Sequence, residues 1–317
     1  MSVSRFSRLG VASLLAAALS APAGAFAAQT THSHKATTPP TTTSPRAPLL
    51  SFSTGPFHAC GVETGGAVAC WGRDKHSNAT PPRGVTFTQV SAGYNHTCGV
   101  KTNRSVTCWG LNSSREATPP AGAFAQVSAG YDHTCGLRTN GTAACWGASD
   151  FGQLVAPRGV TFTQISASYH YACGIKTDAT VTCWGANNTG QATPPAGAFA
   201  QVSAGYDHTC GLKTNGAVAC WGANDFGQLN PPRGVTFTQI GAGYYHACGV
   251  KTNGAVACWG FNSSGDTTPP RGGAFAQVSA GESHTCGLKT NGAVACWGAN
   301  DFGQLNPPRG VTFAVRA

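Results

Sequence analysis

Fourteen cysteines are arranged along the sequence as seven pairs, and the two members of every pair are ten residues apart. Two chemistries are open to such pairs, because two thiols can be joined in a disulfide or can bind zinc together. Zinc-binding knuckles place their cysteines about two to four residues apart, so the wider spacing favours disulfides. The predicted disulfides are Cys60–Cys70, Cys98–Cys108, Cys135–Cys145, Cys173–Cys183, Cys210–Cys220, Cys248–Cys258 and Cys286–Cys296.

The residues between the cysteines of a pair predict a β-hairpin. In one repeat, a three-residue loop at Thr214-Asn215-Gly216 would place Cys210 opposite Cys220. A two-residue Asn-Gly turn would instead place Cys210 opposite Trp221. The even number of cysteines and a leader for export at residues 1–27 favour the first register, with one disulfide inside each hairpin.

The third residue of each such loop must adopt a left-handed backbone conformation, which glycine reaches without strain. Five of the seven repeats have glycine at this position. Arg104 and Ala179 occupy it in the other two repeats, so we expect strained turns at these two places.

Histidine precedes the first cysteine by two residues in six repeats, and tyrosine takes its place in the fourth. This spacing puts the side chain on the same strand face as the cysteine, which predicts a buried hydrogen bond between neighbouring repeats. A ring of metal ligands is the alternative, but radiating repeats would hold the histidines too far apart. The residues concerned are His58, His96, His133, Tyr171, His208, His246 and His284.

No repeat carries a pattern of residues typical of a catalytic site that the other repeats lack. The sequence has no Ser-His-Asp order, glycine-rich phosphate loop or carboxylate pair that distinguishes one repeat from the others. Catalytic sites are asymmetric, whereas this chain is almost symmetric. We therefore expect no enzyme activity, no catalytic or metal-binding residues and no cofactor.

The cysteine pairs recur every 37 or 38 residues, and each second cysteine is followed by Trp-Gly. One copy, residues 237–260, is typical of three short strands separated by a small-residue corner and a tight turn. Such units cannot bury their faces alone and must stack on one another. The sequence predicts an all-β, seven-bladed β-propeller over residues 48–317. Residues 311–315 restart the first-strand pattern and align with residues 49–53, so we expect the N- and C-terminal strands to meet and close the ring.

The sequence of the repeat resembles that of the regulator-of-chromosome-condensation family. The elements that carry the resemblance are His-x-Cys-x-Leu, Asn-Gly, Val-x-Cys-Trp-Gly-x-Asn and Phe-Gly-Gln-Leu, and they cover nearly all of residues 48–317. The cysteine-paired version is similar to the extracellular crinkly repeats of plant receptor kinases and to the propeller-type β-lactamase inhibitory proteins. The resemblance implies a seven-bladed propeller. We do not expect the nuclear roles of the founding family in this protein, because a leader for export and fourteen cysteines argue against a nuclear location.

Aromatic and acidic residues gather in the loops that share one end of the predicted disc, which we call the tyrosine end. It combines the loops between the first and second strands with the loops that follow the third strand. All seven tyrosines are expected there, together with nine of the eleven acids: Asp74, Glu116, Asp132, Asp150, Asp207, Asp225, Asp266, Glu282 and Asp301. The predicted partner-binding residues are Phe57, Tyr94, Tyr131, Asp132, Tyr169, Tyr206, Asp207, Asp225, Phe226, Tyr244, Tyr245, Asp301 and Phe302.

The opposite end, which we call the basic end, is expected to carry Lys101, Arg104, Arg138, Lys176, Lys213, Lys251 and Lys289 at the tight turns. Arg83, Arg158, Arg233, Arg271 and Arg309 precede the first strands on the same end. These cations could contact an anionic polymer of the cell wall, but the simpler interpretation is that they keep the protein soluble.

The first 47 residues do not belong to the repeats. Arg5 and Arg8, an apolar run from Leu9 to Ala21 and the small-residue pattern Ala25-Phe26-Ala27 predict a cleaved Sec-type signal peptide at residues 1–27. Residues 28–47 are rich in threonine and proline, which predicts a disordered linker. No second apolar run is long enough to span a membrane, so we expect a protein that is secreted or held at the cell surface.

The formal net charge is +9, which by itself would suit a nucleic-acid partner. We expect none, because the cations lie mainly on one end and the signal peptide directs export. The sequence favours a monomeric binding protein that contacts another protein through its tyrosine end. The alternatives are a lectin-like propeller that binds carbohydrate of the cell wall with the same aromatics, or a β-lactamase inhibitor.

Overall fold

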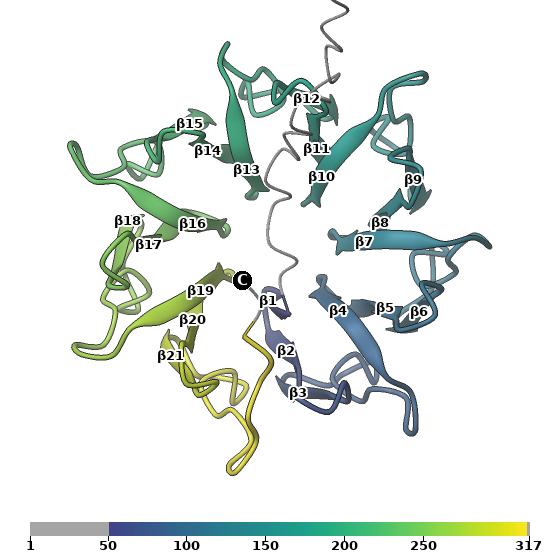
Figure 1. Cartoon of the computed structure of the whole chain (residues 1–317), viewed down its shortest axis with the longest axis horizontal. Coiled ribbons are helices and arrows are strands. Elements are labelled where there is room, and N and C mark those ends of the chain that lie inside the picture. The colour runs from purple at the N-terminus through teal and green to yellow at the C-terminus, as the bar shows by residue number, and fades with distance from the viewer. Residues whose placement is uncertain (1–50, 316–317) are drawn as a thin grey trace, which may run out of the picture. The chain divides into compact units, whose positions relative to one another are not determined.

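The computed structural model describes residues 51–315, which form seven three-stranded antiparallel sheets arranged around a central axis (Figure 1). Each sheet is one blade, with its strands in chain order from the axis outward, so the predicted seven-bladed propeller is confirmed. The segments predicted as signal peptide and linker lie outside the described residues. The blades are β1 (Phe52–Thr54), β2 (His58–Val62) and β3 (Val68–Gly72) in blade 1; β4 (Phe87–Ala92), β5 (His96–Lys101) and β6 (Val106–Gly110) in blade 2; β7 (Phe124–Ala129), β8 (His133–Arg138) and β9 (Ala143–Gly147) in blade 3; β10 (Phe162–Ala167), β11 (Tyr171–Lys176) and β12 (Val181–Gly185) in blade 4; β13 (Phe199–Ala204), β14 (His208–Lys213) and β15 (Val218–Gly222) in blade 5; β16 (Phe237–Ala242), β17 (His246–Lys251) and β18 (Val256–Gly260) in blade 6; and β19 (Phe275–Ala280), β20 (His284–Lys289) and β21 (Val294–Gly298) in blade 7.

The hairpin register follows the three-residue loop. Cys210 lies opposite Cys220, and the equivalent pairing occurs in every blade. All seven predicted disulfides are formed, each within its own blade. Gly216 has a φ of +82° at the third loop position, and Arg104 (+69°) and Ala179 (+65°) adopt the same left-handed conformation without glycine's freedom. The two expected exceptions are therefore confirmed.

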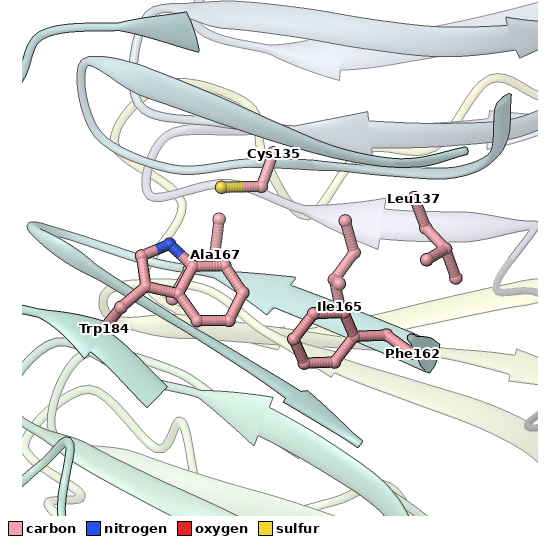
Figure 2. Close-up of a cluster of buried hydrophobic side chains, with 7 residues drawn as sticks. Cys135, Leu137, Phe162, Ile165, Ala167 and Trp184 are labelled. Carbon is pink, nitrogen blue, oxygen red and sulfur yellow. The ribbon is translucent and has the colours of Figure 1, made fainter. Parts of the chain in front are cut away.

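The hydrophobic core lies between blades rather than within them. Cys135 and Leu137 of blade 3 pack against Phe162, Ile165 and Trp184 of blade 4, and equivalent clusters join the other blades (Figure 2). Because each blade supplies only half of every cluster, a single blade could not bury its apolar surface.

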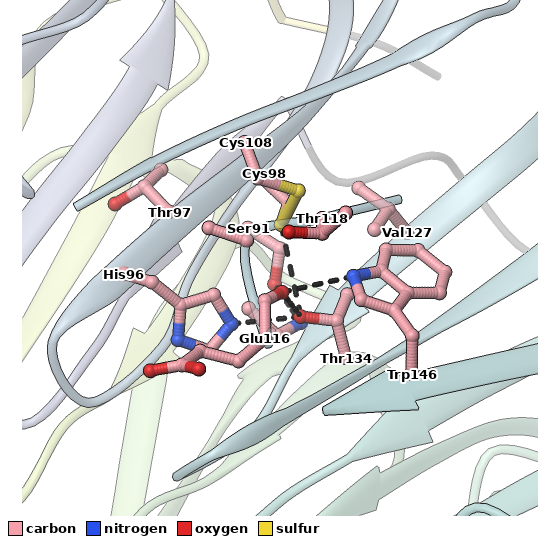
Figure 3. Close-up of a disulfide and its surroundings, with 12 residues drawn as sticks. Ser91, His96, Thr97, Cys98, Cys108, Glu116, Thr118, Val127, Thr134 and Trp146 are labelled. Atoms are coloured by element: carbon pink, nitrogen blue, oxygen red, sulfur yellow. Dashed lines mark hydrogen bonds between the residues drawn. A yellow bond between two sulfur atoms is a disulfide. The ribbon is translucent and has the colours of Figure 1, made fainter. Parts of the chain in front are cut away.

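The repeated tryptophan links each blade to the preceding one. Trp146 Nε1 donates a hydrogen bond of 2.9 Å to the backbone carbonyl of Glu116, and Thr134 Oγ1 donates to the same oxygen at 3.0 Å (Figure 3). All seven tryptophans make the equivalent bond, to the carbonyls of Asn78, Glu116, Gln153, Gln191, Gln228, Asp266 and Gln304. The bond from Trp71 to Gln304 joins blade 1 to blade 7, so the series runs around the whole ring.

The buried histidines hydrogen-bond to the next blade only where that blade offers threonine. His96 Nε2 lies 2.7 Å from Thr134 Oγ1 (Figure 3), and His58 and His246 make the equivalent contacts with Thr97 and Thr285. Tyr171 makes the same contact with Thr209 at 2.9 Å. The predicted bond is wrong for the other three histidines, because the next blade has alanine there: His133 meets Ala172, His208 meets Ala247 and His284 meets Ala59.

The first strand of blade 1 is built from both ends of the described chain. Phe313 forms an antiparallel bridge with Glu63, and Ala314 N donates to the carbonyl of Val62 at 2.8 Å. In blade 2, Phe87 is paired with Lys101, the last residue of the middle strand β5. Phe313 therefore occupies in blade 1 the place that Phe87 has in blade 2, while β1 supplies the remainder of the strand.

Replacement of Phe313 with alanine should destabilise the propeller by about 3–5 kcal/mol. The ring is 1% exposed, and its centroid lies 5.7 Å from that of Trp71, so its removal leaves a cavity where the two ends meet. Chemical denaturation of the purified protein measures the loss. The control is Val315→Ala, because Val315 is 41% exposed and its truncation should cost less than about 0.5 kcal/mol. Equal stability of the two variants would show that the C-terminal segment does not hold the ring.

Candidate functional site

Five consecutive blades each place one tyrosine ring beside the next at the tyrosine end. The ring centroids of Tyr94 and Tyr131 are 4.1 Å apart, and the three following steps are 4.4, 4.3 and 4.4 Å. All five side chains are partly exposed. The result is a continuous tyrosine arc, formed by Tyr94, Tyr131, Tyr169, Tyr206 and Tyr244.

The backbone before each tyrosine fixes the position of the arc. Tyr131 N donates to the carbonyl of Ser168 in blade 4 at 3.0 Å, and Tyr94 N donates to the carbonyl of Gly130 at 3.1 Å. A Cβ on Gly130 would lie 2.2 Å from the Ser168 oxygen, so this close approach requires glycine. The corner of one blade is therefore bonded to the corner of the next, and the rings are held in place before any partner binds.

The arc is interrupted where blade 7 meets blade 1. Glu282 and Pro56 occupy the positions that hold tyrosine in blades 2–6. Phe57 continues the aromatic surface from blade 1, with its ring centroid 5.2 Å from Tyr94 and 5.4 Å from Phe302. The interruption gives an otherwise repetitive surface one distinct place.

A second set of aromatics lies outside the arc in the loops that follow the third strands. Phe226 and Phe302 are 43% and 45% exposed. Each belongs to an Asp-Phe-Gly sequence, which occurs only in blades 3, 5 and 7. Tyr245 connects this outer set to the arc, because its ring centroid lies 5.1 Å from that of Phe226 and 5.7 Å from that of Tyr244.

Burial changes the ionisation of several carboxyl groups at this end. Burial raises the pKa of Glu282, and burial together with the charge of Asp225 raises the pKa of Asp207. Asp132 behaves differently: burial opposes its ionisation, but hydrogen bonding and charge from His133, with a further contribution from His170, lower its pKa overall.

The structure brings most of the predicted partner-binding residues together and corrects three other placements. Tyr171 is not in a loop, because it is fully buried in β11. Glu116 and Asp266 are each 1% exposed, since their carboxylates accept hydrogen bonds from the backbone N–H groups of Ser114 and Ser264. Asp225 and Asp301 are exposed at the tips of the outer loops, beside the phenylalanines that follow them.

Two features of this surface lie outside the predicted partner-binding residues. His170 stacks on Phe151, with ring centroids 4.3 Å apart, and Phe151 is 45% exposed. The loop position that Phe151 shares with Phe226 already places its ring at the tyrosine end, but its contact with His170 depends on the fold of blade 4. The second feature is the position of Glu282 in the series of tyrosines, which an alignment of the seven loops could have shown.

A shallow pocket opens at the centre of the tyrosine end. Its wall consists of the small residues of the seven corners and of the arc residues Tyr94, Tyr131, Tyr169 and Tyr244. Deeper along the axis the lining becomes polar, because the first strands contribute glutamine and serine side chains. Several of these bond to the next blade: Gln126 Nε2, for example, donates to the carbonyl of Ile165 at 2.9 Å.

The profile of the regulator of chromosome condensation (RCC1) repeat matches six segments: residues 87–115, 124–153, 162–191, 199–228, 237–266 and 275–304. This chain belongs to the RCC1 repeat family. The matched RCC1 segments begin at the first strand of blades 2–7. Five of them end at the glutamine or aspartate whose carbonyl binds the next tryptophan, and the segment in blade 2 ends at Arg115, one residue before Glu116. Blade 1 lies outside the match, and its first strand is the one assembled from two distant segments.

Solved structures of similar propellers include two plant receptor-kinase ectodomains. The chain is 29% identical to the entire ectodomain of the receptor kinase CR4 from Physcomitrella patens, covering 79% of this chain and 74% of that one, with a TM-score of 0.69. It is 25% identical to the crinkly ectodomain of ACR4 from Arabidopsis thaliana, covering 85% and 99%, with a TM-score of 0.70. Prp20p of Saccharomyces cerevisiae shares the fold at 15% identity, covering 84% and 87%, with a TM-score of 0.66. A comparison with curated protein sequences gave no match.

Residues 51–315 of this RCC1-repeat chain contain neither a cluster of metal ligands nor an apolar helix that could cross a membrane. No group of three or more histidine, cysteine, aspartate or glutamate side chains is arranged to hold a metal ion in this part.

Proposed function

We propose that this RCC1-repeat propeller is an extracellular binding protein without enzyme activity, and that its tyrosine end contacts another protein. The tyrosine arc carries the proposal. Tyrosine offers a large contact area at a small cost in conformational entropy, and it is enriched among the residues that dominate binding energy. The exposed Phe226 and Phe302 extend this surface outward, with Asp225 and Asp301 beside them.

An extracellular location is supported by the disulfides and by the similar ectodomains. Seven disulfides persist in an oxidising compartment and are rare in the cytosol. We propose that residues 1–27 are removed as a signal peptide and that residues 28–47 link the propeller to its surroundings. N-terminal sequencing of the exported protein should then begin at Ala28.

The packing of the arc favours a protein partner over a carbohydrate. A sugar stacks on an open, flat aromatic face, whereas each ring of the arc is covered in part by its neighbours at 4.1 to 4.4 Å. The exposed edges and hydroxyl groups that remain suit the mixed apolar and polar contacts of a protein interface.

The triple variant Tyr131→Ala, Tyr206→Ala and Tyr244→Ala tests the proposal. We expect it to lose more than about 30-fold in affinity for a partner captured from the extracellular fraction, because clustered aromatic residues contribute about 2 kcal/mol or more. The thermal melting temperature should stay unchanged, since the tyrosine corners are held by backbone bonds. The matched control is Lys101→Ala, Lys213→Ala and Lys251→Ala at the basic end, which should bind normally.

Two outcomes would overturn the proposal. A triple tyrosine variant that fails to fold would show that the arc serves only to hold the blades together. Selective retention on a glycan array, lost in the same variant, would assign the surface to carbohydrate instead. An inhibition assay on β-lactamases tests that one class of partner directly.

A further inference from the structure

We propose that the centre of the tyrosine end binds a basic side chain, lysine or arginine, presented by the partner protein, with Glu282 as its counter-ion. This inference rests on the proposed function and adds the chemistry of the group that is recognised. It follows from three features of the structure: the place of Glu282 in the arc, the lack of a partner for one oxygen of its carboxylate, and the aromatic wall beside it.

Glu282 occupies one of the two positions that the tyrosine arc leaves open, and Pro56 occupies the other. Glu282 follows Gly281, whose carbonyl accepts a 3.0 Å hydrogen bond from Tyr244 N, as the carbonyl of Gly243 accepts one from Tyr206 N. Its carboxylate lies near both ends of the arc. Burial raises the pKa of Tyr244, and the charge of Glu282 raises it further; the same charge contributes to the raised pKa of Tyr94.

One oxygen of the half-buried Glu282 carboxylate has no partner within residues 51–315. This atom, Oε2, is buried and has no hydrogen-bond partner, and no salt bridge to it is formed in this part of the chain. A buried carboxylate without a partner costs free energy, and a cation that binds there removes this cost. Burial accordingly raises its pKa.

The pocket at the centre of the tyrosine end is lined by Gly281, the residue before Glu282, and has the size and lining that a basic side chain needs. Its volume is about 90 Å³, which admits the head of one side chain but no folded element. Tyr94, Tyr169 and Tyr244 are among the residues that line it. Aromatic rings attract lysine and arginine cations over their faces, and phenolic oxygens accept hydrogen bonds from them.

The same end already holds one guanidinium group between aromatic rings. The Cζ atom of Arg73 lies 5.0 Å from the ring centroid of Phe57 and 5.2 Å from that of Phe302. Arg73 therefore shows that the aromatic surface accommodates an arginine head. It lies at blade 1 on the outer aromatics and makes no salt bridge to Glu282, which leaves the central carboxylate for a cation from outside.

A titration of the full-length protein with a short acetylated and amidated Gly-Arg-Gly peptide tests the inference. Calorimetry should show saturable binding at millimolar peptide. A peptide with citrulline in place of arginine keeps the shape but lacks the charge, and we expect it to bind at least about tenfold more weakly. A lysine peptide should bind within about tenfold of the arginine peptide, because both carry the charge.

Two variants remove the charge without a larger change. Glu282→Gln keeps the size of the side chain, and Glu282→Tyr gives blade 7 the residue that blades 2–6 carry. Both should keep the wild-type melting temperature and bind the arginine peptide at least about tenfold more weakly. Asp150→Asn removes one charge from an exposed acid at the same end that is not among the predicted partner-binding residues, and it should change binding less than about twofold.

Equal binding of the arginine and citrulline peptides, or undiminished binding by both Glu282 variants, would overturn the inference. So would the absence of any binding at millimolar peptide. None of these results would affect the proposed protein-binding function, which the triple tyrosine variant tests separately. Loss of partner binding in that variant, with no response to the arginine peptide, would leave the function standing and remove only the basic side chain.

Discussion

Acidification from pH 7 to pH 4 should destabilise the propeller by about 10 kcal/mol, enough to unfold it. Burial at the blade junctions lowers the pKa of five histidines from 6.5: to about 4 for His58 and His246, and to about 3 for His96, His208 and His284. Below about pH 6.5 the unfolded chain therefore binds more protons than the folded chain. Each histidine contributes about 2–3 kcal/mol to this loss, since one pKa unit corresponds to about 1.4 kcal/mol.

The direction and the pH range follow from the lowered pKa values. The stabilisation is complete above about pH 6.5, where the histidines are neutral in both states, and it is lost as the pH falls toward 3–4. Thermal melting measured at half-unit steps of pH should show the decline beginning near pH 6.5. A melting temperature that is constant from pH 7 to pH 4 would contradict the burial of neutral histidines.

Two opposing variants provide the control for this prediction. Blade 4 already carries tyrosine at the histidine position, and Tyr171 bonds to Thr209 of the next blade. His96→Tyr, which faces Thr134 in the same way, should therefore fold and should lose less stability on acidification than the wild type. Tyr171→His adds a buried histidine and should lose more.

Reduction of the disulfides is the second change with a large expected effect. Each disulfide closes a loop across one hairpin, with ten residues of sequence separation, and this restriction of the unfolded chain corresponds to about 2–3 kcal/mol. The seven contributions do not add fully, but their joint loss should bring the denaturation midpoint down by more than half. Denaturation with urea in the presence and absence of a thiol reductant measures the shift.

The accessibility of the sulfurs predicts how reduction proceeds. Cys210 is fully buried between blades, and so are the first cysteines of the other six pairs. A reductant should therefore react slowly with the native protein and rapidly once it unfolds. The pair variant Cys210→Ala with Cys220→Ala should cost about 2–3 kcal/mol. If a zinc chelator destabilised the oxidised protein and reductant did not, the pairs would be metal sites instead.

The repeat made most of the fold predictable. The ten-residue spacing left two registers of the hairpin open, and the even number of cysteines with the predicted leader favoured the one that the structure has, with Cys210 opposite Cys220. The same regularity predicted Arg104 and Ala179 as exceptions to the rule for glycine. These inferences succeed because they depend on local geometry, which the order of residues within one repeat determines.

Contacts between repeats were harder to predict. The role of each buried histidine depends on a residue 38 or 39 positions later: His96 finds Thr134, whereas His133 finds Ala172. The buried state of Glu116 likewise depends on how its loop folds back, since composition alone places an acid at the surface. Such features need the arrangement of neighbouring blades, and this is also why the place of Glu282 in the arc was missed.

The alternation of outer loops has a consequence for how a partner would be oriented. Asp-Phe-Gly occurs in blades 3, 5 and 7, so the pattern has a period of two, and an odd number of blades cannot accommodate that period without one mismatch. The mismatch falls between blades 1 and 2, neither of which has the sequence. A perfectly regular disc would offer a ligand many equivalent rotations about its axis. In this disc one rotation differs from all the others. A partner that contacts the mismatched blades would therefore bind in a single orientation about the axis.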